Sequence, residues 1–425
     1  MHGAATPLSD WLARLETFSS REIDLGLERV AAVLDRLALP AANRIFHVAG
    51  TNGKGSSVAM LESLLRRSDA RIGCYTSPHI LRYNERIRVD GADVSDEQII
   101  ASFERVEAAR GDAELTYFEF GTLAALVVFA DAGMDTLILE VGMGGRLDAV
   151  NAVEPTAGLI TNIALDHCAW LGDSIEAIAF EKAGIMRPGK AVIFGARDVP
   201  PAILEHAGSI DAQLHVAGRD FDWQVNGDTW SWQGSESRLD GLALPALAGR
   251  HQVANAAAVL ALLEAAGDVD VLEAGNVSTA LRGVRLDGRI QEIRNETRWI
   301  VDVAHNPAAA EVLGDALRDQ AKGGKTIAIL GMLDDKDVEG VVNHLQPHVD
   351  QWIAVAADSH RAISADELAR RVANATGVAC LVGDSLESAI ERAEELAGVD
   401  DRVLLTGSFY LVGPALNQLY SRRDS

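Results

Sequence analysis

Cysteine is scarce in this chain, and long apolar runs are absent from it. The 425 residues include three cysteines, Cys74, Cys168 and Cys380, which are widely spaced and form no Cys-x-x-Cys pair. Neither a disulfide framework nor a structural zinc site is therefore indicated, and a reducing compartment is expected. Because no run of about 18 uninterrupted apolar residues occurs, the sequence predicts no membrane span.

Basic residues are also few relative to acidic ones. Lys and Arg number 38 against 62 Asp and Glu, which gives a formal net charge of −24. Nucleic-acid backbones are bound by clustered Lys and Arg, so this charge argues against a nucleic-acid partner. The first residues, MHGAATPLSDWLARLE, lack the charged-then-apolar plan of a signal peptide. We expect a cytoplasmic monomer that acts on small molecules, without a nucleic-acid or membrane partner.

In the first half of the chain, short apolar runs alternate with longer amphipathic ones, which predicts alternating strands and helices. The predicted strands span residues 44–50, 71–77, 135–142 and 157–164, and the predicted helices span 56–68 and 120–133. Such alternation is typical of a parallel sheet that is covered on both faces. Residues 221–245 differ, because alternating aromatics and an Asn-Gly pair predict a β-hairpin or meander.

A second α/β set follows an apolar helix predicted at residues 251–267 and a joint at 281–293. Its predicted strands span 298–306, 325–332, 351–357 and 402–408, with helices at 307–321 and 364–375. No internal repeat or low-complexity tract is visible. With the boundary near residue 285, the fold class is α/β throughout. We expect an N-terminal domain of residues 1–285 with a parallel-rich sheet, and a smaller α/β domain of residues 286–425.

The segment FHVAGTNGKGSS, residues 46–57, combines a strand, a Gly-rich turn and a helix, the context that a phosphate-binding loop requires. Its Lys54 can reach the β- and γ-phosphates of a nucleotide. A Gly-rich turn that binds nothing is the alternative, but a Lys inside Gly-Lys-Gly-Ser has no evident packing purpose. Val48 stands where the common loop has its leading Gly, and Gly55 displaces the hydroxyl residue, Ser56, by one position. A magnesium ligand is therefore expected from another segment.

Other polar residues lie at predicted strand ends, where an α/β sheet has its ligand crevice. Glu140 follows an apolar run, and a buried carboxylate is costly unless it is paired or binds a metal. His167 follows another strand, although a lone histidine is more often structural. From composition alone, Lys182 is a solvated lysine at a helix end and Ser77 is a helix cap. Asn255 is equally consistent with an ordinary helix-interior residue.

AGTNGKGSS resembles the ATP loop of the Mur ligase superfamily, and the Gly after Lys is the form found in its folylpolyglutamate synthases. Ten further segments follow this family's order: IDLGLERV, YTSPHILRYNERIRVDG, LTYFEFGT, LILEVGMGGRLDAVN, NIALDHCAWLG, AFEKAGIMRPGK, GRHQVANAAAVLAL, LDGRIQ, VDVAHNP and TGSFYLVG. The resemblance runs from about residue 20 to about residue 412. It implies a P-loop NTPase-like N-terminal domain and a Rossmann-like C-terminal domain.

The resemblance also implies roles for individual residues. The implied ATP contacts are Thr51, Asn52, Gly53, Lys54, Gly55, Ser56, Asn255, Arg289 and Asp302. The implied pteroate contacts are Asp24, Leu25, Gly26, Thr116, Tyr117, Phe118, Glu119, Leu147, Asp148 and Ala149. Two Mg²⁺ ions are assigned to Ser77, Glu140 and His167, with Glu140 bridging both, and Lys182 is expected to be carbamylated by CO₂. His305 and Ser408 are the candidates for holding the incoming glutamate. Lys54, Glu140, His167 and Lys182 form the implied catalytic set.

The implied activity is that of an ATP-dependent amide ligase, which adds L-glutamate to dihydropteroate and further glutamates to tetrahydrofolates through an acyl phosphate. IDLGLERV, LTYFEFGT and GRLDAVN favour this bifunctional kind over an enzyme that only extends tetrahydrofolate. A ligase acting on a UDP-linked sugar peptide is disfavoured, since only about 40 residues precede the ATP loop where a UDP-binding domain of about 100 would lie. A nucleotide-gated interaction protein is the non-enzymatic alternative.

Overall fold

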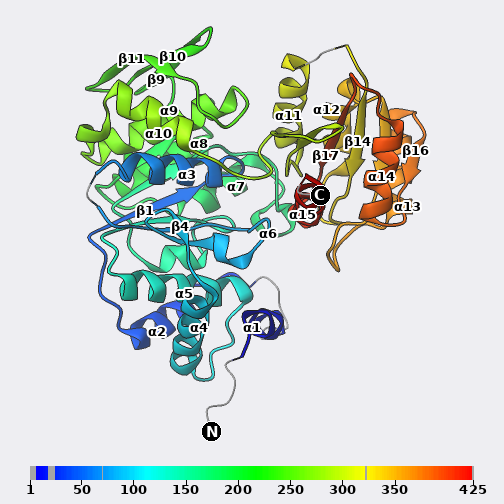
Figure 1. Ribbon diagram of the computed structural model, residues 1–425. Coiled ribbons are helices and arrows are strands. Elements are labelled where there is room, and N and C mark those ends of the chain that lie inside the picture. Colours follow the sequence, from blue (N-terminus) through cyan, green and yellow to red (C-terminus); the bar gives the residue numbers. More distant parts are fainter. Residues whose placement is uncertain (1–5, 18–23, 69, 321–322, 424–425) are drawn as a thin grey trace. The chain divides into compact units, whose positions relative to one another are not determined.

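The computed structural model describes residues 6–17, 24–68, 70–320 and 323–423 (Figure 1). Contacts divide the chain into two compact units, which are treated separately below. Unit 1 comprises Met1–Ile163, Ser174–Leu244 and Ala254–Val284, and unit 2 comprises Ala164–Asp173, Pro245–Val253 and Arg285–Ser425. Unit 2 therefore includes two short segments from the predicted first domain, because contacts rather than chain order decide where a segment belongs.

The main sheet of unit 1 has eight strands in the order β4-β3-β2-β5-β1-β6-β7-β8. The strands are β1 Arg44–Ala49, β2 Ile72–Tyr75, β3 Ile87–Val89, β4 Ala92–Asp93, β5 Thr136–Glu140, β6 Ala157–Ile160, β7 Ala191–Phe194 and β8 Gln213–Val216. All pairs are parallel except those that β3 makes with β2 and β4. The sheet is thus parallel-rich, as the apolar runs at β1, β2, β5 and β6 predict.

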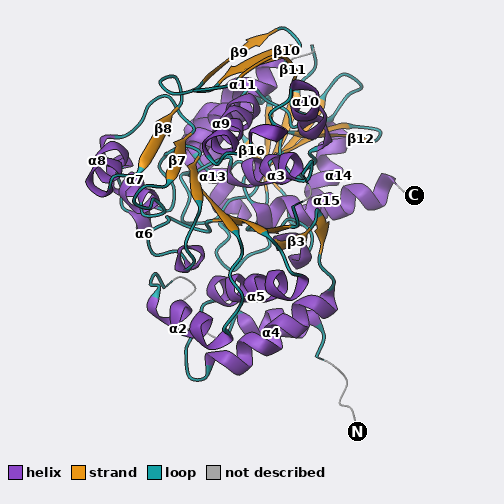
Figure 2. Ribbon diagram, turned by 90° about the vertical axis from the view of Figure 1, so that its left-hand side faces the viewer, coloured by secondary structure: helices purple, strands orange, loops and turns teal. Residues whose placement is uncertain are grey.

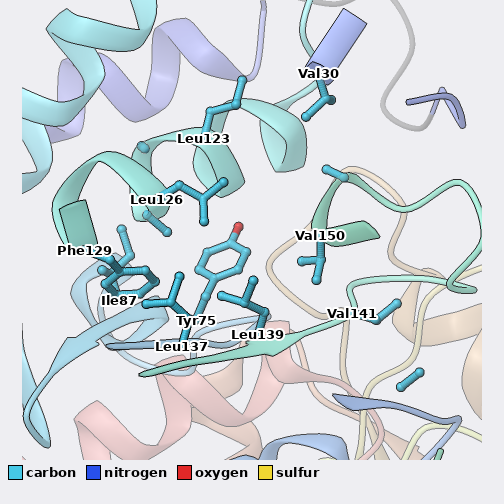
Figure 3. Packing of buried hydrophobic residues seen from close by; sticks show 14 of the residues in the cluster. Val30, Tyr75, Ile87, Leu123, Leu126, Phe129, Leu137, Leu139, Val141 and Val150 are labelled. Carbon is cyan, nitrogen blue, oxygen red and sulfur yellow. The ribbon is translucent and has the colours of Figure 1, made fainter. Parts of the chain in front are cut away.

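The helices of unit 1 pack on this sheet and on one another. They are α1 Leu8–Leu15, α2 Glu28–Leu37, α3 Lys54–Leu65, α4 Asp96–Arg110, α5 Tyr117–Ala132, α7 Ile175–Ala183, α8 Pro201–Ile210, α9 His251–Ala265, whose first turn belongs to unit 2, and α10 Ala274–Gly283. Figure 2 shows α2, α4 and α5 side by side, and each contacts the other two. α5 is buried along most of its length because its sequence is apolar on every face. In Figure 3, Tyr75 lies in this core near Leu126 of α5 and Leu139 of β5.

Unit 1 also contains a three-stranded antiparallel sheet, in the order β11-β10-β9, which confirms the predicted meander. Its strands are β9 Asp222–Asn226, β10 Thr229–Gln233 and β11 Arg238–Ala243. Trp230 and Trp232 alternate with polar residues on β10 and are both buried. The Trp232 Nε1–H group donates to the carbonyl of Ala257 in α9 at 3.1 Å, which attaches this sheet to the helix.

The sheet of unit 2 has six strands in the order β12-β13-β17-β14-β15-β16, with only β12 antiparallel. These strands are β12 Gln291–Arg294, β13 Arg298–Val301, β14 Thr326–Leu330, β15 Gln351–Ala354, β16 Cys380–Val382 and β17 Arg402–Thr406. Its helices are α6 Cys168–Leu171, α11 Pro307–Asp319, α12 Val338–Leu345, α13 Ala365–Thr376, α14 Leu386–Leu396 and α15 Phe409–Arg423. Trp299 of β13 and Trp352 of β15 are buried in this unit. The predicted joint at 281–293 is partly regular, since it contains the end of α10 and the start of β12.

Short 3₁₀ helices complete the two units: η1 Tyr83–Arg86, η2 Ala149–Ala152, η3 Val269–Val271 and η4 Gln346–His348. In the part of the chain that the structure describes, no helix combines the length and apolar character needed to cross a membrane. Cys74, Cys168 and Cys380, all within the described ranges, are free thiols.

Candidate active site

The predicted phosphate loop is the turn between β1 and α3. Gly50 has a φ of 141°, and a Cβ at this position would overlap the Thr161 hydroxyl and lie 3.0 Å from the Thr161 nitrogen. Thr161 and Asn162 follow β6 and hold the loop from the other side. The Thr161 Oγ1–H group donates to the Asn52 carbonyl at 2.6 Å, and Asn162 Nδ2 donates to the same oxygen at 3.0 Å. The loop is therefore fixed by two residues that sequence reasoning did not single out.

Two lysine side chains converge on this loop. Lys54 Nζ donates to the Gly50 carbonyl at 3.1 Å and to the Thr51 carbonyl at 3.2 Å. Lys182 Nζ, from the last turn of α7, donates to the Gly50 carbonyl at 2.9 Å. Lys182 is only 4% exposed, so the interpretation as a solvated helix-end lysine is wrong. Two ammonium groups beside one carbonyl make a local positive site in a chain whose net charge is −24, as an anionic ligand would require.

Asn255 of α9 lies against the same loop. A Cβ at Gly53 would lie 2.8 Å from Asn255 Oδ1, so a larger residue at position 53 would displace the amide. Asn255 and Ser56 are both buried, and Ser56 lies in the first turn of α3. The fold thus brings a residue about 200 positions away in sequence to the loop that the motif predicted.

Glu140 and Ser77 lie together at the carboxyl ends of β5 and β2. In the register of the parallel strands β1 and β5, Glu140 lies opposite Val48, which directly precedes the phosphate loop. The Glu140 residue is 4% exposed. Its Oε2 accepts a hydrogen bond from the Ser77 backbone N–H at 3.2 Å. A carboxylate and a hydroxyl are oxygen donors of the kind that Mg²⁺ prefers. These two predicted metal ligands therefore suit the expected ion.

His167 belongs to unit 2, unlike Ser77 and Glu140. It precedes α6 with a left-handed φ of 52°, and its backbone N–H donates to Asp166 Oδ1 at 2.8 Å. Among the described residues, no group of three or more His, Cys, Asp or Glu side chains is arranged to hold a metal ion. The assignment of His167 as a metal ligand stays a prediction.

The predicted pteroate residues of two distant segments meet through Arg29 of α2. Thr116 caps α5, and its backbone N–H donates to Glu119 Oε2 at 2.8 Å. Arg29 Nε donates to Glu119 Oε2 at 2.9 Å, and Arg29 Nη1 donates to Asp24 Oδ2 at 3.0 Å. Glu119 is therefore a buried, paired carboxylate rather than only a first-turn acid. Sequence reasoning missed Arg29, although it stands within the IDLGLERV motif. Of the other predicted contacts here, Leu25 is half-buried and Gly26 is buried.

Tyr117 and Phe118 are half-buried aromatic residues in the first turn of α5. The centroids of the Phe118 and Tyr75 rings are 5.8 Å apart. The Phe118 ring also leaves no space for a side chain at Gly142, because a Cβ there would lie 2.5 Å from Phe118 Cζ. The Tyr117 ring packs edge-on against Tyr83 at 6.0 Å. Both rings retain partly accessible surface on which a flat heterocycle can pack.

Asp148 caps η2 after the turn that follows β5. Its Oδ2 accepts from the Met143 N–H at 2.8 Å, and its Oδ1 accepts from the Val150 N–H at 3.0 Å. Burial raises the pKa of Asp148 to about 7, although these backbone hydrogen bonds oppose the rise. Leu147 beside it is half-buried, whereas Ala149 is buried.

In unit 2, the predicted ATP and glutamate residues lie where β13 and β17 end. Both oxygens of Asp302 accept backbone N–H groups, from Ile290 at 2.8 Å and from Ala304 at 2.7 Å. His305 Nδ1 lies 2.8 Å from the Val303 carbonyl, and Ser408 is buried at the start of α15.

Asp166 is the centre of a buried polar cluster in this unit. Lys336 Nζ donates to Asp166 Oδ1 at 2.5 Å, and Asn306 Nδ2 donates to Asp166 Oδ2 at 3.1 Å. His305 Nε2 lies 3.4 Å from Asp166 Oδ2. Burial alone would raise the pKa of Asp166, but the hydrogen bond and charge of His305, with the charges of His167 and Lys336, hold it well below its usual range. Sequence reasoning missed Lys336, which follows the strand 325–332 in the polar run LDDKD.

Both halves of the chain match family models of known ligases. Residues 48–263 match the Mur ligase middle domain. Residues 288–409 match the Mur ligase, glutamate ligase domain. With the α/β fold and the phosphate-loop site, these matches define the class of the protein as a Mur ligase.

Individual relatives narrow the class. The dihydrofolate synthase/folylpolyglutamate synthase of Escherichia coli is 41% identical over 422 residues, which cover 99% of this chain and 97% of the relative. The structure of E. coli FolC in complex with DHPP and ADP superimposes with a TM-score of 0.92 at 40% identity, covering 100% of both chains. A bifunctional folylpolyglutamate synthase/dihydrofolate synthase with Mn, AMPPNP and L-glutamate bound gives a TM-score of 0.90 at 40% identity, covering 99% of this chain and 100% of the other. The chain belongs to the dihydrofolate synthase/folylpolyglutamate synthase family.

Proposed function

We propose that this protein is an ATP-dependent amide ligase that adds L-glutamate to dihydropteroate and further glutamates to tetrahydrofolates, releasing ADP and phosphate. The convergence of Lys54 and Lys182 on the Gly50 carbonyl, beside Glu140, carries the proposal. The relatives support it, because they bear both activities in their names and have been solved with DHPP, ADP and L-glutamate.

In this proposal, the backbone of Thr51–Ser56, Lys54 and Asn255 bind ATP, and Arg289 and Asp302 are further ATP contacts. The substrate carboxylate attacks the γ-phosphorus, and the bond to the leaving ADP oxygen breaks, which gives an acyl phosphate. Lys54 and Arg289 neutralise the charge of the transferring group. The α-amine of glutamate then attacks the acyl carbon and displaces phosphate, so no covalent enzyme intermediate is required.

The metal site that we propose uses Ser77, Glu140 and His167 for two Mg²⁺ ions. When bound, these ions supply Lewis-acid neutralisation of the phosphate oxygens. We include carbamylation of Lys182 in the proposal, because its buried amine lies beside the loop and not in solvent. The carbamate is an anion, so Lys54 then remains as the ammonium group at the Gly50 carbonyl. Mass spectrometry after incubation with ¹³C-bicarbonate and chemical trapping of the adduct would detect that modification.

The pteroate surface in this proposal has two parts. Asp24, Leu25, Gly26 and Thr116–Glu119 form one part, which Arg29 connects, and Leu147, Asp148 and Ala149 form the other. His305 and Ser408 hold the incoming glutamate. We further propose that the protein works as a monomer in the cytoplasm, where its three free thiols suit a reducing environment.

The decisive measurement is glutamate-dependent phosphate release with dihydropteroate and with tetrahydrofolate, assayed side by side. Both substrates should support turnover, whereas activity with tetrahydrofolate alone would identify a monofunctional folylpolyglutamate synthase. Glu140→Ala should reduce turnover by at least about 100-fold, the loss expected when a transition-state charge contact is removed. The exposed Glu205 offers a matched control, and Glu205→Ala should behave as the wild type. Nucleotide binding without turnover in the wild type would instead favour an interaction protein.

A further inference from the structure

The chain segment that carries Arg289 is held by a three-residue cluster, Asp287, Gln291 and Tyr420, which we call the Tyr420 clasp. The Tyr420 hydroxyl donates to Asp287 Oδ1 at 2.7 Å. Gln291 Nε2 donates to the same carboxylate oxygen at 2.7 Å and to the Tyr420 oxygen at 2.8 Å. Gln291 Oε1 accepts the Gly288 N–H at 2.9 Å. Because every donor meets an acceptor, the geometry of the clasp is fixed.

The backbone inside the clasp has an unusual conformation on both sides of Arg289. Gly288 has a φ of 64°, and Ile290 has a φ of 47°. A β-branched residue rarely adopts a left-handed conformation, and it persists only where the surroundings hold it in place. The end of β13 supplies part of that restraint, because the Ile290 N–H donates to Asp302 Oδ2 at 2.8 Å and the Gly288 carbonyl accepts from Val303 at 3.1 Å. The clasp supplies the rest.

Helix α15 contacts this segment at two separate points. At its first residue, the Phe409 ring centroid lies 5.3 Å from the Arg289 guanidinium carbon, which is cation–π geometry. Eleven positions later, Tyr420 binds Asp287 and Gln291. Phe409 therefore contacts the arginine head while Tyr420 restrains the backbone from which that side chain extends.

We propose that Tyr420 is a positioning residue for ATP use, which acts through Arg289 and has no contact with the nucleotide itself. The inference rests on the proposed function, in which Arg289 contacts ATP. Without the Tyr420 hydroxyl, Asp287 and Gln291 lose their shared partner, and residues 288–290 can relax toward ordinary backbone angles. Arg289 then leaves the orientation that Phe409 supports.

Loss of one hydroxyl should not detach α15 from unit 2. Asn295 Nδ2 donates to the Leu419 carbonyl at 3.3 Å, which ties the helix to the turn between β12 and β13 independently of the clasp. Leu411, Val412, Leu416 and Leu419 are also buried along the same helix. Tyr420→Phe keeps the ring and removes the hydrogen bonds that the hydroxyl makes with Asp287 and Gln291, so it separates positioning from packing.

The experiment compares Tyr420→Phe, Arg289→Ala and the double variant, with Ser421→Ala as the control. Ser421 is exposed, and within the described part of the chain its hydroxyl bonds only to the Asn417 carbonyl of its own helix. We expect Tyr420→Phe to raise KM for ATP about threefold to tenfold, the range that loss of one hydrogen bond gives. Its kcat and its KM for glutamate should change less than about twofold, and Ser421→Ala should match the wild type. In the Arg289→Ala background, Tyr420→Phe should add no further rise in KM for ATP.

The possible outcomes separate this inference from the proposed function. If Arg289→Ala raises KM for ATP and Tyr420→Phe does not, the inference fails while the role of Arg289 stands. If the effects add in the double variant, Tyr420 does not act through Arg289 and is only a structural residue. The same conclusion would follow if kcat and both KM values changed in parallel and the melting temperature fell. If Arg289→Ala itself leaves KM for ATP unchanged, the proposed ATP role of Arg289 is wrong.

Discussion

Substitution of Gly50 by alanine tests the geometry of the phosphate loop directly. A Cβ at position 50 would overlap the Thr161 hydroxyl and would lie 3.0 Å from the Thr161 backbone nitrogen, which cannot rotate away. The Thr161 side chain would have to turn and give up its hydrogen bond to the Asn52 carbonyl, now 2.6 Å long. The φ of 141° at Gly50 is itself unfavourable for a residue with a Cβ.

These two contributions set the expected magnitude. A strained backbone conformation costs about 1–3 kcal/mol. The lost Thr161 hydrogen bond costs about 0.5–1.5 kcal/mol. Gly50→Ala should therefore lower the free energy of unfolding by about 1.5–4.5 kcal/mol, which corresponds to a fall in Tm of about 3–18 °C. The Gly50 carbonyl would also shift relative to Lys54 and Lys182, so ATP binding should weaken at least about tenfold.

Thermal unfolding and calorimetric titration with ATP would measure both effects. Gly189→Ala is the matched control, since Gly189 has a φ of 66° but no atom within 4 Å of an added Cβ. That variant should lose only about 1–2 kcal/mol and bind ATP normally. Thr161→Ala should partly restore the stability of Gly50→Ala by removing the overlapping hydroxyl. Equal Tm losses in Gly50→Ala and Gly189→Ala, or wild-type ATP affinity in Gly50→Ala, would refute the reasoning.

Three further substitutions test other parts of the site. Arg29→Ala leaves the buried Glu119 carboxylate without its guanidinium partner, so KM for dihydropteroate should rise about tenfold. The affinity for ATP, measured by calorimetry, should stay unchanged, and a weaker ATP complex would contradict this prediction. Lys182→Ala should lower kcat at least about 100-fold yet leave the protein folded by circular dichroism, and near-normal turnover would count against a catalytic role. The pKa of Asp148, raised to about 7 by burial, means that the folded protein holds this proton more tightly than the unfolded chain. Its contribution to stability is therefore complete below about pH 4 and is lost as pH rises through about 7, so Asp148→Asn should flatten the pH dependence of urea unfolding across that window. Parallel pH profiles for Asp148→Asn and wild type would exclude this.

The parts of the fold that sequence reasoning anticipated are those whose signal is local. The strands β5 and β14 are buried throughout, and β1 is buried over its last four residues, so these short apolar runs are a clear local signal. The expectation of amphipathic helices between them is wrong for α5, which is apolar on every face. The aromatic alternation of β10 likewise reflects one buried face. Helix α4 carried an equally local signal that was not used, the capping box in which Ser95 and Gln98 bond reciprocally.

The site was harder to predict because its important contacts are distant in sequence. Arg29 and Glu119 are 90 residues apart, and Lys336 and Asp166 are 170 residues apart. From the neighbouring sequence alone, Arg29 and Lys336 look like an arginine and a lysine on a solvated surface. The burial of Lys182 has the same origin, because only the packing of α7 beside the phosphate loop removes its ammonium group from water.

The tryptophans provide an optical reporter for each unit. Trp230 and Trp232 are buried in unit 1, and Trp299 and Trp352 are buried in unit 2. Because an indole ring emits at longer wavelength once water reaches it, unfolding of either unit should shift fluorescence from its own pair. Because Trp11 and Trp223 also lie in unit 1 and Trp170 in unit 2, a signal from unit 1 alone requires phenylalanine at positions 170, 299 and 352. A signal from unit 2 alone requires phenylalanine at positions 11, 223, 230 and 232, and a destabilising substitution could then be assigned to the unit that it weakens.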